Sequence, residues 1–171
     1  MNEIKMTPLR PPSIRLLDKY VGEHFAPLYT ATVRVTGGAA EHGRASGQAC
    51  SDDGMLTVDL RLPVALGGPG GGTNPEQLFA AGYAACFHAA LCLLAARVGL
   101  LVAGAVVEVA ATFGRDPVDG LFALTACVHV ELPGIERHVA EELIRNTERI
   151  CPYAKMARDG IASTVQIKTP I

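Results

Sequence analysis

The chain has 171 residues, of which 49% are hydrophobic and 19% charged, and its formal net charge at pH 7 is −2. This length is typical of one domain, and the composition is sufficient for a hydrophobic core. A chain without excess positive charge lacks the basic face that neutralises phosphates, so nucleic-acid binding is not expected. The first residues contain no continuous apolar stretch of the kind found in secretory signals, which predicts a cytoplasmic protein.

Residues 1–27 are polar and contain several prolines, and we interpret them as an N-terminal extension ahead of a single domain over residues 28–171. Within the extension, apolar residues at helical spacing follow Ser13 and predict a short amphipathic helix over residues 14–21. The pattern does not indicate what this helix does.

Two strands are predicted in the next part of the chain. The first covers residues 28–35, where β-branched and aromatic residues lead to the turn signal Gly37-Gly38. The second covers residues 55–62 and follows the hairpin-turn sequence at residues 51–54.

A glycine-rich loop over residues 67–72 leads into a long apolar helix. Asn74 is a good N-cap, Pro75 suits the first helical position, and Gln77 fits a capping box. The helix is apolar enough to consider a membrane span, but His88 and Arg97 interrupt it, so we interpret it as a buried central helix. The loop lacks the Gly-Lys-Ser/Thr ending of a phosphate-binding loop, so no nucleotide site is expected.

The remaining pattern predicts two paired strands, a helix and a last strand. The strands cover residues 105–113 and 121–131, with Val128 and Val130 on one face and Cys127 and His129 on the other. An amphipathic helix over residues 136–150 ends at Cys151-Pro152, and the last strand covers residues 161–167. Strands and helices in this order predict an α+β fold.

Cys86, inside the long helix, is the first candidate for chemistry. Burial raises a thiol pKa, and the helix dipole acts only in the first turn, so ionising Cys86 requires a cationic side chain held by a carboxylate. Glu76 is the candidate carboxylate, but ten residues at about 1.5 Å each place it roughly 15 Å away. A homodimer that brings Glu76 of one chain to Cys86 of the other is a simpler geometry than a helix bend at Gly82.

Cys151 is the candidate second thiol. A reducing cytosol leaves structural thiols unbridged, so any disulfide there is catalytic or redox-sensing. His88 is rotated by about 200° from Cys86 on the helix and is assigned to packing. No histidine has the spacing of a metal site, so no metal is expected. The other cysteines are assigned structural roles: Cys50, Cys92 and Cys127.

Four segments of the chain resemble the organic hydroperoxide resistance (Ohr) family, which lies within the OsmC-type superfamily. They are residues 28–33, the Thr-Gly-Gly turn at 36–38, the motif TNPEQLFAAGYAACF at 73–87, and ERICPYAKMARDGI at 148–161. The resemblance covers residues 28–167 and leaves the N-terminal extension outside it.

The resemblance implies an OsmC/Ohr-like α+β fold around a long central helix, in an intertwined homodimer with two active sites at the interface. It also implies a thiol peroxidase that reduces alkyl or fatty-acid hydroperoxides without haem, flavin or metal. By motif position, Cys86 is the peroxidatic cysteine, Cys151 the resolving cysteine, and Glu76 the carboxylate that orients an activating arginine. A Cys86 sulfenic acid would condense to a Cys86–Cys151 disulfide, and a lipoyl-type dithiol on a partner protein would reduce it.

The family's usual place for the arginine, directly after the Thr-Gly-Gly turn, is occupied by Ala39, and Arg44 in a longer loop is the nearest candidate. An apolar substrate route is predicted from four residues of the helix, for which core packing is the alternative: Leu78, Phe79, Tyr83 and Phe87. Two other functions stay open: a non-catalytic thiol redox sensor or binding protein, and another OsmC-type activity on esters or disulfides.

Overall fold

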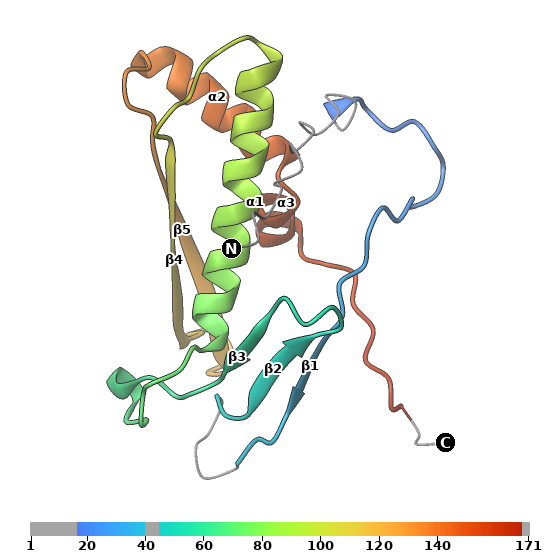
Figure 1. Ribbon diagram of the computed structural model, residues 1–171, viewed down its shortest axis with the longest axis vertical. Coiled ribbons are helices and arrows are strands. Elements are labelled where there is room, and N and C mark those ends of the chain that lie inside the picture. The colour runs from blue at the N-terminus through green and yellow to red at the C-terminus, as the bar shows by residue number, and fades with distance from the viewer. Residues whose placement is uncertain (1–16, 40–44, 169–171) are drawn as a thin grey trace, which may run out of the picture.

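The computed structural model describes residues 17–39 and 45–168 (Figure 1). Its elements follow in the order β1 (Val33–Thr36), β2 (Gln48–Ser51), β3 (Thr57–Asp59), the short 3-10 turn η3 (Val64–Leu66), α1 (Pro75–Arg97), β4 (Val106–Arg115), β5 (Phe122–Glu131), α2 (Arg137–Ile150) and α3 (Pro152–Asp159). Within the described residues the strands form two separate antiparallel sheets, β1-β2-β3 and β4-β5. The predicted α+β class is confirmed.

The long helix α1 begins where the sequence predicts. Asn74 has an extended backbone, and its side-chain oxygen accepts a hydrogen bond from the Gln77 backbone N–H at 2.9 Å. Pro75 takes the first helical position, where no intrahelical N–H is needed. The Gln77 side chain does not close a capping box on Asn74 but accepts a hydrogen bond from the Thr73 hydroxyl at 2.8 Å.

The hydrophobic core forms along one face of α1, whose buried residues recur every four positions. This face packs against β4, α2 and α3, as Figure 1 shows. The buried cluster comprises Tyr83, Phe87, Leu91, Ala95, Leu143, Cys151 and Ala154. By length and composition α1 passes as a membrane span, a test that the core helix of a soluble protein also passes, and 22% of its most apolar window is buried within the described chain.

The β4–β5 hairpin confirms the predicted strand pair. Its register runs from Val106 opposite Glu131 to Arg115 opposite Phe122. Val128 and Val130 pack toward the core cluster, whereas the side chains on the opposite face, including Cys127 and His129, are exposed. The alternation of side chains along the strand therefore assigns the faces correctly at Val128 and Val130, whereas Phe122 and Leu124, which the same alternation assigns to the core face, are 59% and 49% exposed.

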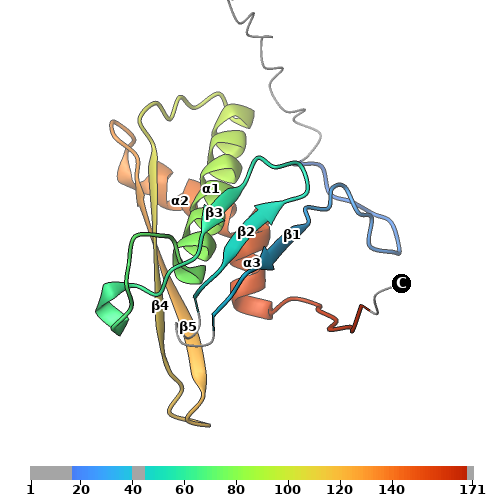
Figure 2. The same ribbon diagram turned by 60° about the horizontal axis from the view of Figure 1, so that its bottom comes forward.

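Three sequence-based expectations for this part of the fold are corrected. β1 and β3 are shorter than the predicted ranges 28–35 and 55–62. Residues 161–167 form no strand within the described chain, and Val165 and Ile167 are 99% and 96% exposed. Figure 2 shows this C-terminal segment leading away from α3 without lying along a sheet. A strand needs a neighbouring edge, which the β-like pattern of a segment does not supply.

The C-terminal helices and the N-terminal extension also differ from expectation. Pro152 does end α2, but it also starts α3, because proline suits the first position of a new helix. The predicted helix over residues 14–21 begins outside the described residues, and residues 18–21 are not helical.

The cap of α1 gives a stability prediction. Asn74 is 8% exposed, so Asn74→Ala leaves the Gln77 N–H without its acceptor in a shielded position. We expect the free energy of unfolding to fall by about 1 kcal/mol, measured by urea denaturation at fixed protein concentration. Asn74→Ser keeps an acceptor and should retain most of the stability. An alanine variant as stable as the wild type would contradict the role of the cap.

Candidate thiol site

Two cysteines that are 65 residues apart in sequence meet at the middle of α1. The sulfur of Cys151 lies 3.7 Å from the sulfur of Cys86. Cys86 is partly exposed in the third turn of α1, whereas Cys151 is fully buried between α2 and α3. A disulfide bond is about 2.05 Å long, so the two sulfurs need to approach by less than about 2 Å to bond.

The backbone around Cys151 is fixed by both neighbouring helices. Its N–H donates to the Thr147 carbonyl at 2.9 Å and thereby caps α2, while its own carbonyl accepts from the Lys155 N–H at 3.0 Å in the first turn of α3. Pro152 forces the change of direction between the two helices. The sharp α2–α3 junction thus holds the buried thiol against α1.

Gly82 allows α3 to approach this closely. It lies one turn before Cys86 on the same side of α1, and a Cβ added there would lie 2.8 Å from the Tyr153 hydroxyl oxygen. The Tyr153 ring packs on Tyr83 with a centroid distance of 5.8 Å, and its backbone N–H donates to the Cys86 sulfur. From the sequence, Gly82 is weighed only as a site for a helix bend, which is set aside in favour of a dimer, and Tyr153 is given no role. A glycine one turn before the cysteine is nevertheless a signal for close packing.

The surroundings of Cys86 disfavour its thiolate. Burial raises the pKa of Cys86, and the neighbouring Cys151 thiol raises it further, while the hydrogen bond from the Tyr153 N–H opposes this in part. No arginine or lysine in the described part of the chain is among the groups that shift this pKa. In this arrangement the neutral thiol is therefore the favoured form of Cys86.

Cys86 opens onto a cavity of about 1160 Å³. Its wall on α1 is apolar and includes Ala90 and Leu94, and the α2–α3 junction forms the opposite wall. Its charged lining is mainly positive, with one carboxylate, Asp18, against four basic side chains: Lys19, Arg97, Arg149 and Lys155. An organic molecule with an apolar body and a negative group suits these walls.

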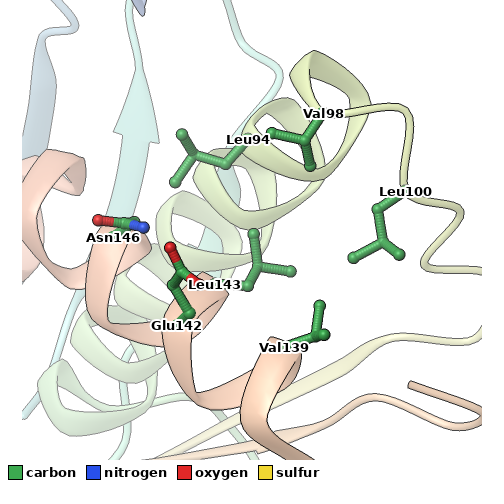
Figure 3. A pocket seen from close by; sticks show the side chains of 7 residues that line it. All are labelled: Leu94, Val98, Leu100, Val139, Glu142, Leu143 and Asn146. Carbon is green, nitrogen blue, oxygen red and sulfur yellow. The ribbon is translucent and has the colours of Figure 1, made fainter. Parts of the chain in front are cut away.

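A smaller apolar pocket adjoins the thiol cavity (Figure 3). It has a volume of about 260 Å³, and its lining residues Leu94 and Asn146 also border the thiol cavity. Figure 3 shows apolar side chains from α1, α2 and the segment after α1 around one space, with the polar ends of Glu142 and Asn146 at one side. The two hollows together extend the apolar route away from Cys86.

The described chain does not bring Glu76 to Cys86. Glu76 lies in the first turn of α1, ten residues before Cys86, which is roughly 15 Å along an α-helix. Figure 1 shows α1 as one unbroken helix between them. The expectation that these two residues cannot share a site within one subunit agrees with this geometry.

Arg44 lies outside the described residues, and only the ends of its loop are described. The Ala39 N–H donates to the Ser46 hydroxyl oxygen at 2.9 Å, and the Ser46 hydroxyl donates to the Ala39 carbonyl at 3.2 Å. Ala39 occupies the position expected for the family's arginine. Its two hydrogen bonds with the Ser46 hydroxyl connect the two ends of the loop.

The four residues predicted to line a substrate route do not border the Cys86 cavity. Tyr83 and Phe87 are 6% and 3% exposed in the core, and Phe79 packs edge-on against Tyr83 at 6.0 Å. Leu78 is partly buried beside them on α1. Core packing, the alternative interpretation, describes these positions, and substrate contact by any of them stays a prediction.

His88 packs away from Cys86, as its helical position predicts. Its Nε2 lies 3.3 Å from the Ala105 carbonyl, and its ring lies 3.8 Å from the Cys92 sulfur. Burial raises the pKa of Cys92. Across residues 17–39 and 45–168, no group of three or more His, Cys, Asp or Glu side chains has an arrangement that could hold a metal ion.

Comparisons with known proteins identify the family of this chain. The profile of the OsmC-like protein family matches residues 68–166. The chain is 38% identical over 141 residues to an organic hydroperoxide resistance protein of Xanthomonas axonopodis pv. citri, covering 82% of this chain and 94% of that protein. It is 36% identical to the organic hydroperoxide resistance protein OhrB of Bacillus subtilis, covering 82% and 98% of the two chains.

Solved structures show the same fold. The crystal structure of Bacillus subtilis OhrB matches with a TM-score of 0.67 at 38% identity and covers 78% of this chain and 93% of that one. An organic hydroperoxide resistance protein from Legionella pneumophila matches with a TM-score of 0.69 at 36% identity, covering 79% and 93%. Both the sequence and the fold therefore place the chain in the OsmC-like family, among the organic hydroperoxide resistance proteins.

Proposed function

We propose that this protein is a thiol-dependent peroxidase that reduces organic hydroperoxides to alcohols, with Cys86 as the peroxidatic and Cys151 as the resolving cysteine. The observation that carries the proposal is the 3.7 Å separation of their sulfurs at the edge of a large cavity. The names of its relatives, organic hydroperoxide resistance proteins, support the same class of substrate.

The reaction uses the two thiols in sequence. The Cys86 thiolate attacks one peroxide oxygen, the O–O bond breaks, and the alkoxide leaves as the alcohol after taking a proton. Cys86 is then a sulfenic acid, and the Cys151 sulfur attacks it with loss of water to form the disulfide. A lipoyl-type dithiol on a donor protein, entering from the open cavity, restores both thiols by exchange. In this scheme the protein needs no bound cofactor.

Arg44 is the proposed source of the positive charge that ionises Cys86, with Glu76 of the partner subunit as the carboxylate that orients it. The raised pKa of Cys86 supports a need for such a cation. The hydrogen bonds between Ala39 and Ser46 hold the two ends of the Arg44 loop together.

The proposal includes an intertwined homodimer. Apolar side chains on both terminal segments lie in solvent: Leu28 is 86% exposed, and Val165 and Ile167 are almost completely exposed. Apolar segments without a covering surface are a feature of chains that assemble. Val33 and Val35 of the edge strand β1 are also about half exposed, and an open edge can accept a strand from a second copy.

Two hollows support an organic substrate with an apolar tail. The thiol cavity receives the peroxide group at Cys86, and the pocket beyond Leu94 receives the tail. The positive side chains Arg149 and Lys155 at the cavity suit the carboxylate of a fatty-acid hydroperoxide. We place this reaction in the cytoplasm, as the sequence predicts.

A thiol redox sensor is the second candidate function. The 3.7 Å separation of the two sulfurs fits it as well, because a sensor also oxidises to a disulfide between neighbouring thiols. A sensor becomes oxidised once and does not turn over with a dithiol. A turnover assay with a hydroperoxide and a dithiol therefore separates the two functions.

The turnover assay uses tert-butyl hydroperoxide with dihydrolipoamide. We expect multiple turnovers for the wild type, with a Cys86–Cys151 disulfide detected by peptide mass spectrometry before reduction. Cys86→Ser should retain less than about 1% of the activity, because the attacking sulfur is lost. Cys151→Ser should stop after one turnover as a sulfenic acid, and Cys50→Ser should match the wild type. Multiple turnovers in Cys86→Ser would contradict the peroxidase, and a single oxidation of the wild type would favour the sensor.

The tail pocket gives a test of substrate shape. Val139→Trp fills the pocket of about 260 Å³ and displaces two or more methylenes of a fatty-acid hydroperoxide. At about 0.8 kcal/mol for each methylene, kcat/KM for linoleic acid hydroperoxide should fall roughly tenfold, with no change for tert-butyl hydroperoxide. Val118→Trp, on an exposed turn, is the matched control. Equal loss for both substrates would refute the pocket as a tail site.

A further inference from the structure

The outer face of the β4–β5 hairpin carries a second cluster with a thiol. Cys127 and His129 are two residues apart on β5, so their side chains project from the same face. The strand register places Glu108 of β4 opposite His129, and the small Ala110 opposite Cys127. The sheet thus sets a thiol, an imidazole and a carboxylate side by side.

The three groups contact one another in a chemically useful order. The Cys127 sulfur lies 3.7 Å from the His129 Nε2, and the Glu108 carboxylate lies 3.9 Å from the His129 Nδ1. A nucleophile beside a base, with a carboxylate orienting the base, is the arrangement that activates cysteine nucleophiles. A carboxylate near Nδ1 favours the proton there, which leaves Nε2 to accept the proton of the thiol.

Two other cysteines lack one part each of this arrangement. Cys50 is also exposed on a strand, but its sulfur contacts the Ser51 carbonyl and the Thr57 hydroxyl, with no imidazole among these partners. Cys92 does lie beside His88, but it is partly buried, and burial raises its pKa. Cys127 combines an exposed sulfur with an imidazole.

The cluster is open to small molecules. The side chains of His129 and Glu108 are 65% and 76% exposed. A hollow of about 440 Å³ lies next to them, and its walls include Glu108, His129 and Glu131. Two carboxylates in one small hollow favour a positively charged reagent over a negatively charged one. The opposite face of the hairpin packs on the core, so the sheet separates this cluster from Cys86.

We propose that Cys127 is a second reactive thiol of this protein, which exchanges with small disulfides that carry amino groups and forms a mixed disulfide on the outer face of the hairpin. This site does not depend on the proposed peroxidase function, because it uses neither Cys86 nor Cys151.

The exchange balances without a further oxidant. His129 Nε2 accepts the proton of Cys127, and the thiolate attacks one sulfur of the disulfide RSSR. The S–S bond of the reagent breaks, the new Cys127–SR bond forms, and the leaving RS⁻ takes the proton from His129 to become RSH. Cys127 is oxidised and the leaving sulfur is reduced, because the electron pair of the thiolate forms the new S–S bond while the pair of the broken S–S bond departs with RS⁻. A thiol in excess reverses the reaction.

The test compares two cysteines in the same molecule. The reduced, full-length protein is exposed briefly to cystamine at pH 7 and low salt, acid-quenched, and mapped by peptide mass spectrometry. We expect Cys127 to be modified about tenfold faster than Cys50, the exposed control. His129→Gln should bring the Cys127 rate down to about that of Cys50, and Glu108→Gln should lower it several-fold.

The charge of the disulfide reagent provides an independent test of the proposal. Bis(2-hydroxyethyl) disulfide is neutral, so the Cys127 to Cys50 rate ratio should be about threefold smaller than with cystamine, and 0.5 M salt should remove most of that difference. Equal rates at Cys127 and Cys50, or a Cys127 rate unchanged by His129→Gln, would overturn the proposal. A rate ratio that is the same for both disulfides would overturn the preference for amino groups. Peroxide turnover by Cys86 is measured separately and bears on neither result.

Discussion

The structure depends on the close packing of the α2–α3 junction against the middle of α1. Gly82 has no side chain, so the Tyr153 ring can lie against the helix, and the junction then holds the Cys151 sulfur 3.7 Å from Cys86. The same packing completes the core along α1. Stability and the candidate chemistry therefore rest on one contact surface, which explains why the thiols are rigidly positioned while the cavity beside them is open.

This packing also creates the chemical difficulty of the site. Apolar surroundings raise the pKa of Cys86, and a protonated sulfur is a poor nucleophile. The described chain supplies a second thiol, a cavity and an N–H donor, and none of its described arginines or lysines is among the groups that shift the pKa of Cys86. A positive group from the Arg44 loop, oriented by a second subunit, would supply what is lacking. Under this proposal, assembly and activity are linked, because the site is complete only when the apolar terminal segments are covered by a partner.

The sequence predicts the local features of this protein well and the long-range ones less well. Asn74 and Pro75 define the start of α1 by local hydrogen bonding, and the alternation in β5 assigns Cys127 and His129 to the outer face. Local pattern does not specify a partner edge, so the predicted strand at 161–167 is not formed within the chain. The pairing of Cys86 with Cys151 followed from the family resemblance rather than from spacing. Tyr153 was missed because its importance arises only when α3 packs on Gly82.

The most direct test of this account is the pKa of Cys86 in the assembled protein, with and without Arg44. It is obtained from the rate of iodoacetamide alkylation of Cys86 against pH, followed by peptide mapping. Burial alone raises the pKa, so Arg44→Ala should titrate above the ordinary thiol value of about 8.5 and react slowly at pH 7. The wild type and the surface control Arg137→Ala should titrate below that value. The same pKa for Cys86 in the wild type and in Arg44→Ala would contradict the account.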